Sequence, residues 1–199
     1  MSVIKRALGS AMIAVLLGGC VGGLGPKTPA SIYDLDAPRS FKDVRGSTQA
    51  QILIPVPSAV KALDTDAIAV KSDGTVITYF SGGQWSDRLP VLVQARVIEA
   101  FENSGRVRAI GRPGEGLLIH YQISTNVRAF QLEVDGGSQG VVEIAAKIIN
   151  DRNGRVVATR TFRAAVPTGG DSIDPAVKGL DAALHSVLVE LVEWVLVRI

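Results

Sequence analysis

The sequence predicts an α/β fold, in which a mixed β-sheet has two main helices packed on it, as a single domain after a signal peptide and a flexible tether. Three patterns predict it. Short apolar or alternating stretches indicate strands, and two longer stretches repeat apolar residues at three- and four-residue steps, as amphipathic helices do. The two kinds of stretch are also interleaved along the chain. A length of 199 residues, with 47% hydrophobic and 20% charged residues, suits one domain with short appendages.

The first twenty residues are typical of an export signal. Lys5 and Arg6 precede an apolar run of 11 residues, Ala7 to Leu17, which suits a signal peptide and is too short to span a bilayer as a helix. No small-residue A-x-A cleavage site follows. The run instead ends in Leu17, Gly18, Gly19 and Cys20, which resembles the lipobox of bacterial lipoproteins. The resemblance implies cleavage before Cys20 and lipidation of its thiol; the alternative is a stray cysteine in a conventional signal.

On this interpretation the signal peptide is residues 1–19, the lipidated cysteine and flexible tether are residues 20–31, and the folded domain is residues 32–199. The eleven residues after Cys20 reach at most about 36 Å when extended. Two or three acyl chains would form a practically permanent membrane anchor. By the same resemblance, the lack of Asp after Cys20 favours the outer membrane over the inner one, with the protein in the cell envelope facing the periplasm.

The first elements follow this tether. Residues 50–57 form a short apolar run bounded by prolines, which predicts a buried strand, and a short helix is expected around residues 58–63. Residues 68–80 have two β-rich halves around Asp73 and Gly74, a hairpin signal because a type I′ turn needs positive φ at both central residues. The apolar spacing over residues 90–104 predicts a helix.

Long strands dominate the second half. Between residues 117 and 134 the apolar positions change from odd to even, which predicts a bulge or bend near residues 128–130 because a regular strand cannot change phase. A second hairpin is expected to join strands around 142–148 and 156–166. Asp174 is expected to cap the final helix, with Pro175 in its first turn. The apolar stripe of this final helix is Val177, Leu180, Leu184, Val187, Leu188, Leu191 and Val195. Residues 188–199 are apolar on more than one face, so this end is either buried, which we favour, or docked on another surface.

Charge and motifs argue against several classes of function. Without Lys5 and Arg6, 19 basic residues balance 19 acidic ones, so no basic patch for nucleic acid is indicated. The two histidines, His120 and His185, fit no metal-ligand spacing, and residues 111–116 lack the G-K-S/T of a phosphate loop. No serine lies in a G-x-S-x-G elbow. We therefore expect no catalytic residue, no metal, no cofactor and no enzyme activity.

Three stretches together resemble a known family: residues 32–36 (IYDLD), residues 79–105 and the apolar C-terminal helix. The arrangement is similar to that of the auxiliary lipoproteins of ABC transport systems, the group that includes the PqiC-like proteins, and it covers roughly residues 32–197. The matching positions are Tyr33, Leu35, Trp85, Asp87 and Pro90. Gln84 stands where the family often has Arg, and an extra residue precedes Pro90, so a role for that arginine does not transfer. A structural interpretation stands beside this one, with Trp85 as a packing anchor at a strand-to-helix corner and Asp87 or Ser86 as a helix N-cap.

The resemblance implies a non-catalytic component of an envelope transport machine. The implied partners are an ABC permease and ATPase complex and an MCE-type substrate-binding protein, whose periplasmic assembly the lipoprotein would dock at a membrane. The implied cargo is phospholipid or another hydrophobic molecule, and an oligomer of identical chains is compatible with this role. The alternative is a structural or assembly envelope lipoprotein that braces an outer-membrane complex without a transport role.

Overall fold

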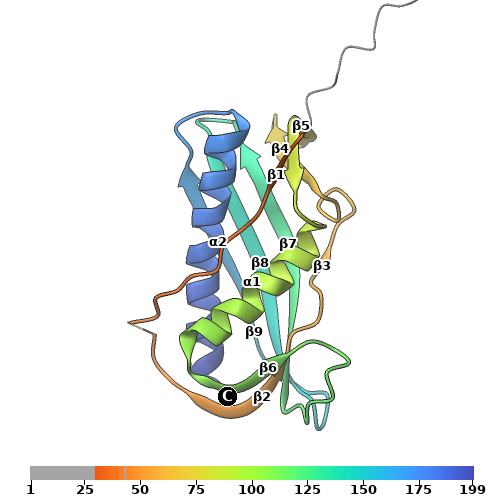
Figure 1. Ribbon diagram of the computed structural model, residues 1–199, viewed down its shortest axis with the longest axis vertical. Helices are drawn as coiled ribbons and strands as arrows, with labels where there is room; N and C mark the ends of the chain where they lie inside the picture. Colours follow the sequence, from red (N-terminus) through yellow and green to blue (C-terminus); the bar gives the residue numbers. More distant parts are fainter. Residues whose placement is uncertain (1–29, 43) are drawn as a thin grey trace, which may run out of the picture.

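The structure, a computed structural model, describes residues 30–42 and 44–199. A nine-stranded mixed sheet forms one layer, and helices α1 (Leu89–Ser104) and α2 (Ile173–Leu196) both lie on the same face of it (Figure 1). The predicted α/β fold, a mixed sheet with two main helices, is confirmed.

The sheet is built around one long central strand, β7. On one side β7 pairs antiparallel with β8 along its whole length, and β8 pairs with β9. On its other side β7 pairs in parallel with β2, β3 and β4, which meet successive parts of it. β6 continues the sheet beyond β2, and β5 and β1 continue it beyond β4. The strands are β1 (Ser31–Tyr33), β2 (Thr48–Leu53), β3 (Ser58–Ala59), β4 (Ala67–Ser72), β5 (Val76–Trp85), β6 (Val107–Gly111), β7 (Tyr121–Glu133), β8 (Gln139–Asn150) and β9 (Val156–Pro167).

Both predicted hairpins and the predicted bulge are present. The β4–β5 hairpin turns at residues 73–75, where Asp73 and Gly74 have φ values of 50° and 67°. The register of β7 against β8 shifts between Val127 and Ala129, which places the bulge at Arg128. This extra residue returns the apolar side chains of β7 to the face that the helices cover.

Three local predictions are wrong. The short helix expected around residues 58–63 is not formed; Ser58 and Ala59 form β3, because the Asn126 side chain donates to Ser58 O and Oγ at 3.2 and 2.8 Å and the segment pairs with β7. Neither Asp87 nor Ser86 caps α1, since Arg88 occupies the N-cap position. The cap position of α2 is Ser172, and Asp174 lies in the first turn.

The core lies between the sheet and the two helices. All seven residues of the predicted α2 stripe are buried, and so are Trp194 and Leu196 at the end of the helix. Trp194 packs edge-on against Phe162 of β9, with ring centroids 5.5 Å apart. The apolar end of α2 is therefore buried, which confirms the favoured alternative, although Val197 just after the helix is 61% exposed. Within the described segments, neither helix is long and apolar enough to cross a membrane.

Candidate functional site

The described chain begins with an extended segment that crosses the helical layer. Residues 31–42, which we term the strap, start as β1 at one end of the molecule and then run across α2 (Figure 1). Leu35, Ala37 and Phe41 of the strap are buried and 7% exposed or less. The strap therefore adds apolar side chains to the core although most of it has no regular secondary structure.

Tyr33 and Trp85 are direct partners in the parallel pairing of β1 with β5. The Ser86 N–H donates to the Tyr33 carbonyl oxygen at 2.7 Å, which continues this pairing to the start of α1. The Trp85 side chain is 1% exposed and contacts Phe130 edge-on, with ring centroids 5.7 Å apart. The structure thus brings Tyr33, Leu35 and Trp85 together, and Trp85 lies in the core as its packing interpretation expects.

The hydroxyl of Tyr33 fastens the strap to α2. It donates a hydrogen bond to Asp174 Oδ1 at 2.6 Å, and this bond, helped by desolvation and the carboxylate charge, raises the pKa of Tyr33 above its ordinary value. The tyrosine ring passes over Gly83, where a Cβ would lie 2.5 Å from Tyr33 Cε2 and 2.6 Å from Ile173 Cδ1. Glycine at position 83 therefore makes the contact between the tyrosine and the helix possible.

A second carboxylate of α2 holds the strap further along. Asp181 Oδ1 accepts a hydrogen bond from the backbone N–H of Asp36 at 2.8 Å. Asp174 and Asp181 are two helical turns apart and so share one face of α2. Sequence reasoning interpreted Asp174 as a cap and did not single out Asp181, because nothing in the helical pattern shows that a distant segment binds this face.

The remaining motif residues shape the corner between β5 and α1. Pro90 is buried in the first turn of α1. Asp87 is exposed, and its carboxylate accepts the Arg88 N–H at 2.6 Å. Asp34 of the strap reaches this corner, since its Oδ1 accepts the Ser86 hydroxyl at 3.2 Å. Gln84, at the position where the family often has Arg, is exposed on β5.

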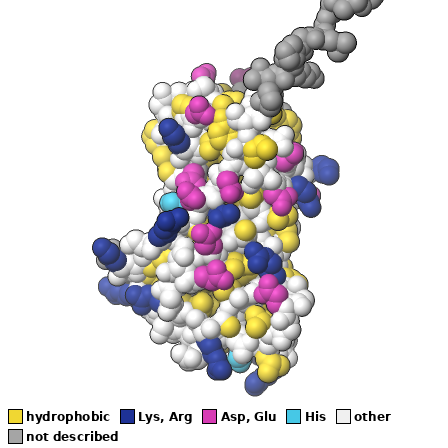
Figure 2. All heavy atoms as spheres, in the orientation of Figure 1, with side chains coloured by type: hydrophobic (Ala, Val, Ile, Leu, Met, Phe, Trp, Pro, Cys, Tyr) yellow, Lys and Arg dark blue, Asp and Glu magenta, His cyan; other side chains and the backbone are white. Residues whose placement is uncertain are grey.

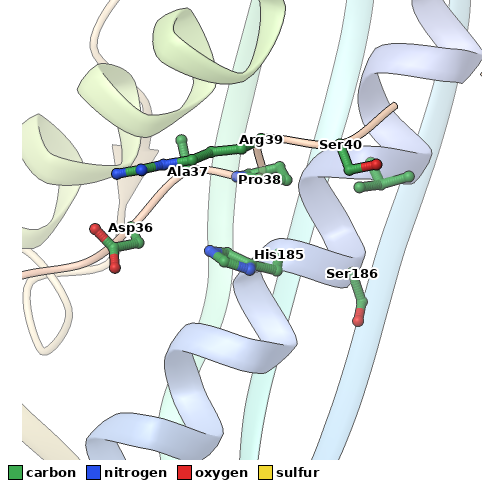
Figure 3. A pocket seen from close by; sticks show the side chains of 8 residues that line it. Asp36, Ala37, Pro38, Arg39, Ser40, His185 and Ser186 are labelled. Atoms are coloured by element: carbon green, nitrogen blue, oxygen red, sulfur yellow. The ribbon is translucent and has the colours of Figure 1, made fainter. Parts of the chain in front are cut away.

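An open groove of about 670 Å³ lies beside the strap (Figure 3). Its walls are strap residues Asp36, Ala37, Pro38, Arg39 and Ser40 on one side and α2 residues His185, Ser186 and Val189 on the other. His185, Asp36 and Ser186 are residue types found in hydrolases, but they do not form a relay here. Ser186 points away from His185, and its hydroxyl donates to Ala182 O of its own helix at 3.2 Å. Within residues 30–42 and 44–199, no cluster of three or more His, Cys, Asp or Glu side chains could hold a metal ion.

Four of the predicted site residues lie outside the described residues. They are the lipidation site Cys20 and the lipobox residues Leu17, Gly18 and Gly19.

Comparison with known protein families shows which family this chain belongs to. A family model described as "ABC-type transport auxiliary lipoprotein component" matches residues 33–192, from Tyr33 of the strap into α2. The chain belongs to this family. As an ABC-type transport auxiliary lipoprotein component, it is a lipoprotein anchored at a membrane of the cell envelope.

Two individual proteins are similar to this auxiliary lipoprotein. It is 31% identical over 191 residues to an uncharacterized protein of Bradyrhizobium diazoefficiens, and the alignment covers 92% of this chain but 51% of that relative. The chain therefore spans about half the length of that relative. A crystal structure of protein XCC0632 from Xanthomonas campestris is similar with a TM-score of 0.80 and 27% identity, covering 85% of this chain and 96% of that one.

More distant structures share the fold alone. A PelC dodecamer from Paraburkholderia phytofirmans matches with a TM-score of 0.50 at 12% identity, covering 76% of this chain and 94% of that chain.

Proposed function

We propose that this auxiliary lipoprotein docks the periplasmic part of an ABC/MCE-type transport system at the membrane that holds its own lipid anchor. The partners in this proposal are an MCE-type substrate-binding protein and the ABC permease and ATPase complex. The cargo is phospholipid or another hydrophobic molecule. The anchor is the acylated Cys20, at the end of a signal peptide of residues 1–19, and the membrane is the outer one.

The observation that carries the proposal is the attachment of the strap to the core. A lipid anchor on Cys20 would pull on the domain through residues 21–31 and then through the strap. That strap is held by the hydrogen bonds to Asp174 and Asp181, by pairing with β5 and by the buried Leu35 and Phe41. A domain joined so firmly to its anchored end suits a component that holds a larger assembly in place at a membrane.

The proposal gives the chain no catalytic step. The family is described as a transport auxiliary component, and the Ser186 hydroxyl in the groove beside the strap is bonded to the helix backbone instead of to a base. The chemistry that the groove and the strap offer is hydrogen bonding and contact with charged groups.

An oligomer of identical chains is part of the proposal. One protein with the same fold forms a dodecamer, and repeated copies would give a larger assembly several contacts at once.

Affinity purification of the mature lipoprotein from detergent-solubilised membranes tests the proposed function. The expected result is capture of an MCE-type protein together with the permease and ATPase. Capture of an outer-membrane barrel or of peptidoglycan without any transport component would favour the alternative, an envelope protein with a structural or assembly role. Size measurement of the same sample reports the oligomeric state.

A further inference from the structure

Two loops lie together at the end of the molecule opposite the start of the described chain. One connects β6 to β7, residues 112–120, and the other is the β8–β9 turn, residues 151–155 (Figure 1). The Asp151 N–H donates to the His120 carbonyl oxygen at 3.0 Å, which joins the two loops. A groove of about 570 Å³ runs between them, lined by residues that include Leu118, Arg152 and Asn153. We term segments 105–120 and 147–157 the distal end.

Large apolar side chains are exposed at the distal end. Leu118 is 82% exposed, which is the highest value among the large hydrophobic residues that the structure describes, and Val156 and Val157 are 55% and 47% exposed. A single exposed leucine is ordinary on a protein surface. Leu118 also lines the groove between the two loops, and an exposed apolar side chain beside a groove is suited to contact with a partner.

The segment that presents Leu118 is fixed to the sheet. His120, two residues further on, donates its backbone N–H to Gln51 O at 2.9 Å, and its Nδ1 accepts the Gln51 N–H at 2.9 Å. Its carbonyl oxygen accepts the Asp151 N–H as well. The backbone at this point is already ordered. Binding of a partner at Leu118 therefore costs less conformational entropy than binding to a free loop would.

Positive charge is concentrated at the same end. Segments 105–120 and 147–157 contain six basic residues and two acidic ones. The basic residues are Arg106, Arg108, Arg112, Lys147, Arg152 and Arg155. Lys and Arg side chains are visible at the lower end of the molecule in Figure 2. Since the whole chain carries a net charge of only +2, this excess is a local feature of the surface.

We propose that the distal end binds an acidic surface of a periplasmic protein, with Leu118 inserted into an apolar hollow of that partner. The identity of the partner as a component of the transport assembly rests on the proposed function. Arg152 and Arg155 are exposed, and no ion pair among the described residues engages either of them, so both are available to partner carboxylates. Complementary charge would speed and orient docking, and the apolar contact would hold it.

The dimensions of the molecule favour a protein over the anchoring membrane as the occupant. The 12 residues of β8 extend about 40 Å along the long axis, so the distal end is far from residue 30, where the described chain begins (Figure 1). The eleven residues that follow Cys20, residues 21–31, reach at most about 36 Å. The distal end could touch that membrane only with the tether pulled straight along the whole domain, which costs its conformational entropy.

Site-specific photocrosslinking of the full-length lipoprotein in its native membranes tests this inference. A benzophenone amino acid replaces Leu118 in one sample and, as the matched control, Val76 in another; Val76 is 46% exposed on the hairpin at the opposite end. Each of the two probe positions is also tested in a chain that carries both Arg152→Glu and Arg155→Glu. A chain that carries Lys178→Glu on α2 instead is the charge control.

The expected product at position 118 is a crosslink to an acidic segment of a periplasmic transport component. We expect it to fall at least about tenfold with the two arginine reversals and with added salt, and to be unchanged by Lys178→Glu. Crosslinks to lipid alone, to a second copy of this chain, or to nothing while purification still captures the transport component would overturn the inference and leave the proposed function intact. Failure to capture any transport component by either method would overturn both.

Discussion

At the scale of single residues, Tyr33 connects three parts of the molecule. Its backbone pairs with Trp85, its ring passes over Gly83 and its hydroxyl donates to Asp174. The sequence identifies Tyr33 and Trp85 through their motif, but it does not identify Asp174 as a partner, because residues 33 and 174 are 141 positions apart. Such a pairing is set by the tertiary fold, which local patterns do not encode.

The bond between Tyr33 and Asp174 predicts a specific alkaline titration. Since the folded-state pKa of Tyr33 is raised, neutral Tyr33 contributes stability that is fully present below pH about 10 and is lost as the pH rises through the folded-state value. Tyrosinate absorbance should show one of the three tyrosines ionising late in the native protein. That late component should be absent from Tyr33→Phe and should move to lower pH in Asp174→Asn. An unchanged late component in Tyr33→Phe would contradict the assignment.

Trp85 is expected to act mainly on stability. Its side chain is 1% exposed and stacks edge-on against Phe130, so Trp85→Ala should lower the free energy of unfolding by about 3–5 kcal/mol. Denaturant titration measures the change, and Leu118→Ala, at an exposed site, should shift it by no more than about 0.5 kcal/mol. A Trp85 variant that is as stable as the native protein but no longer binds its partner would make Trp85 a contact residue instead.

At the scale of elements, periodic patterns were informative and irregular segments were not. The change of phase in β7 predicted the bulge at Arg128, and the stripe of α2 predicted its buried face, because both follow from the repeat of a regular element. The strap and β3 have no repeat to detect. Ser58 and Ala59 adopt a strand only because β7 offers them hydrogen-bonding partners, so their structure could not be derived from the local sequence.

Two glycines set how closely α2 approaches the sheet. A Cβ on Gly140 of β8 would lie 2.5 Å from the backbone carbon of Gly179 in α2, and a Cβ on Gly179 would lie 2.5 Å from Thr168 Cγ2. Gly140→Ala should therefore separate helix and sheet and lower the free energy of unfolding by about 1–3 kcal/mol. Gly82→Ala in β5 is the matched control, since nothing lies within 4 Å of its added methyl group. Equal stability of the two variants in thermal unfolding would show that the helix does not pack this closely.

At the scale of the whole molecule, the proposed functions divide between two ends. The strap begins at one end, where the proposed membrane tether would join it, and the distal end presents Leu118 and a basic surface at the other (Figures 1 and 2). The sequence predicts the anchor from the resemblance of residues 17–20 to a lipobox. It does not show that residues 105–120 and 147–157 meet, since these segments come together only when β7 and β8 pair.

Cys20→Ala separates anchoring from folding. Without the thiol no diacylglycerol can be attached, so the precursor should stay uncleaved or be found in the wrong compartment. The domain of residues 32–199 should still fold, because the described strap, sheet and helices supply the residues of one continuous hydrophobic core. Membrane fractionation reports the location and protease resistance reports folding. Loss of folding in this variant would contradict the separation of tether and domain.

The central claim is that this lipoprotein holds an ABC/MCE-type transport assembly at a membrane. Crosslinking of the mature chain in intact cell envelopes, followed by mass spectrometry of the products, tests it most directly. We predict an MCE-type protein among the crosslinked partners, with its contacts at the distal end. An outer-membrane barrel or peptidoglycan as partner, with no transport component among the products, would contradict the claim.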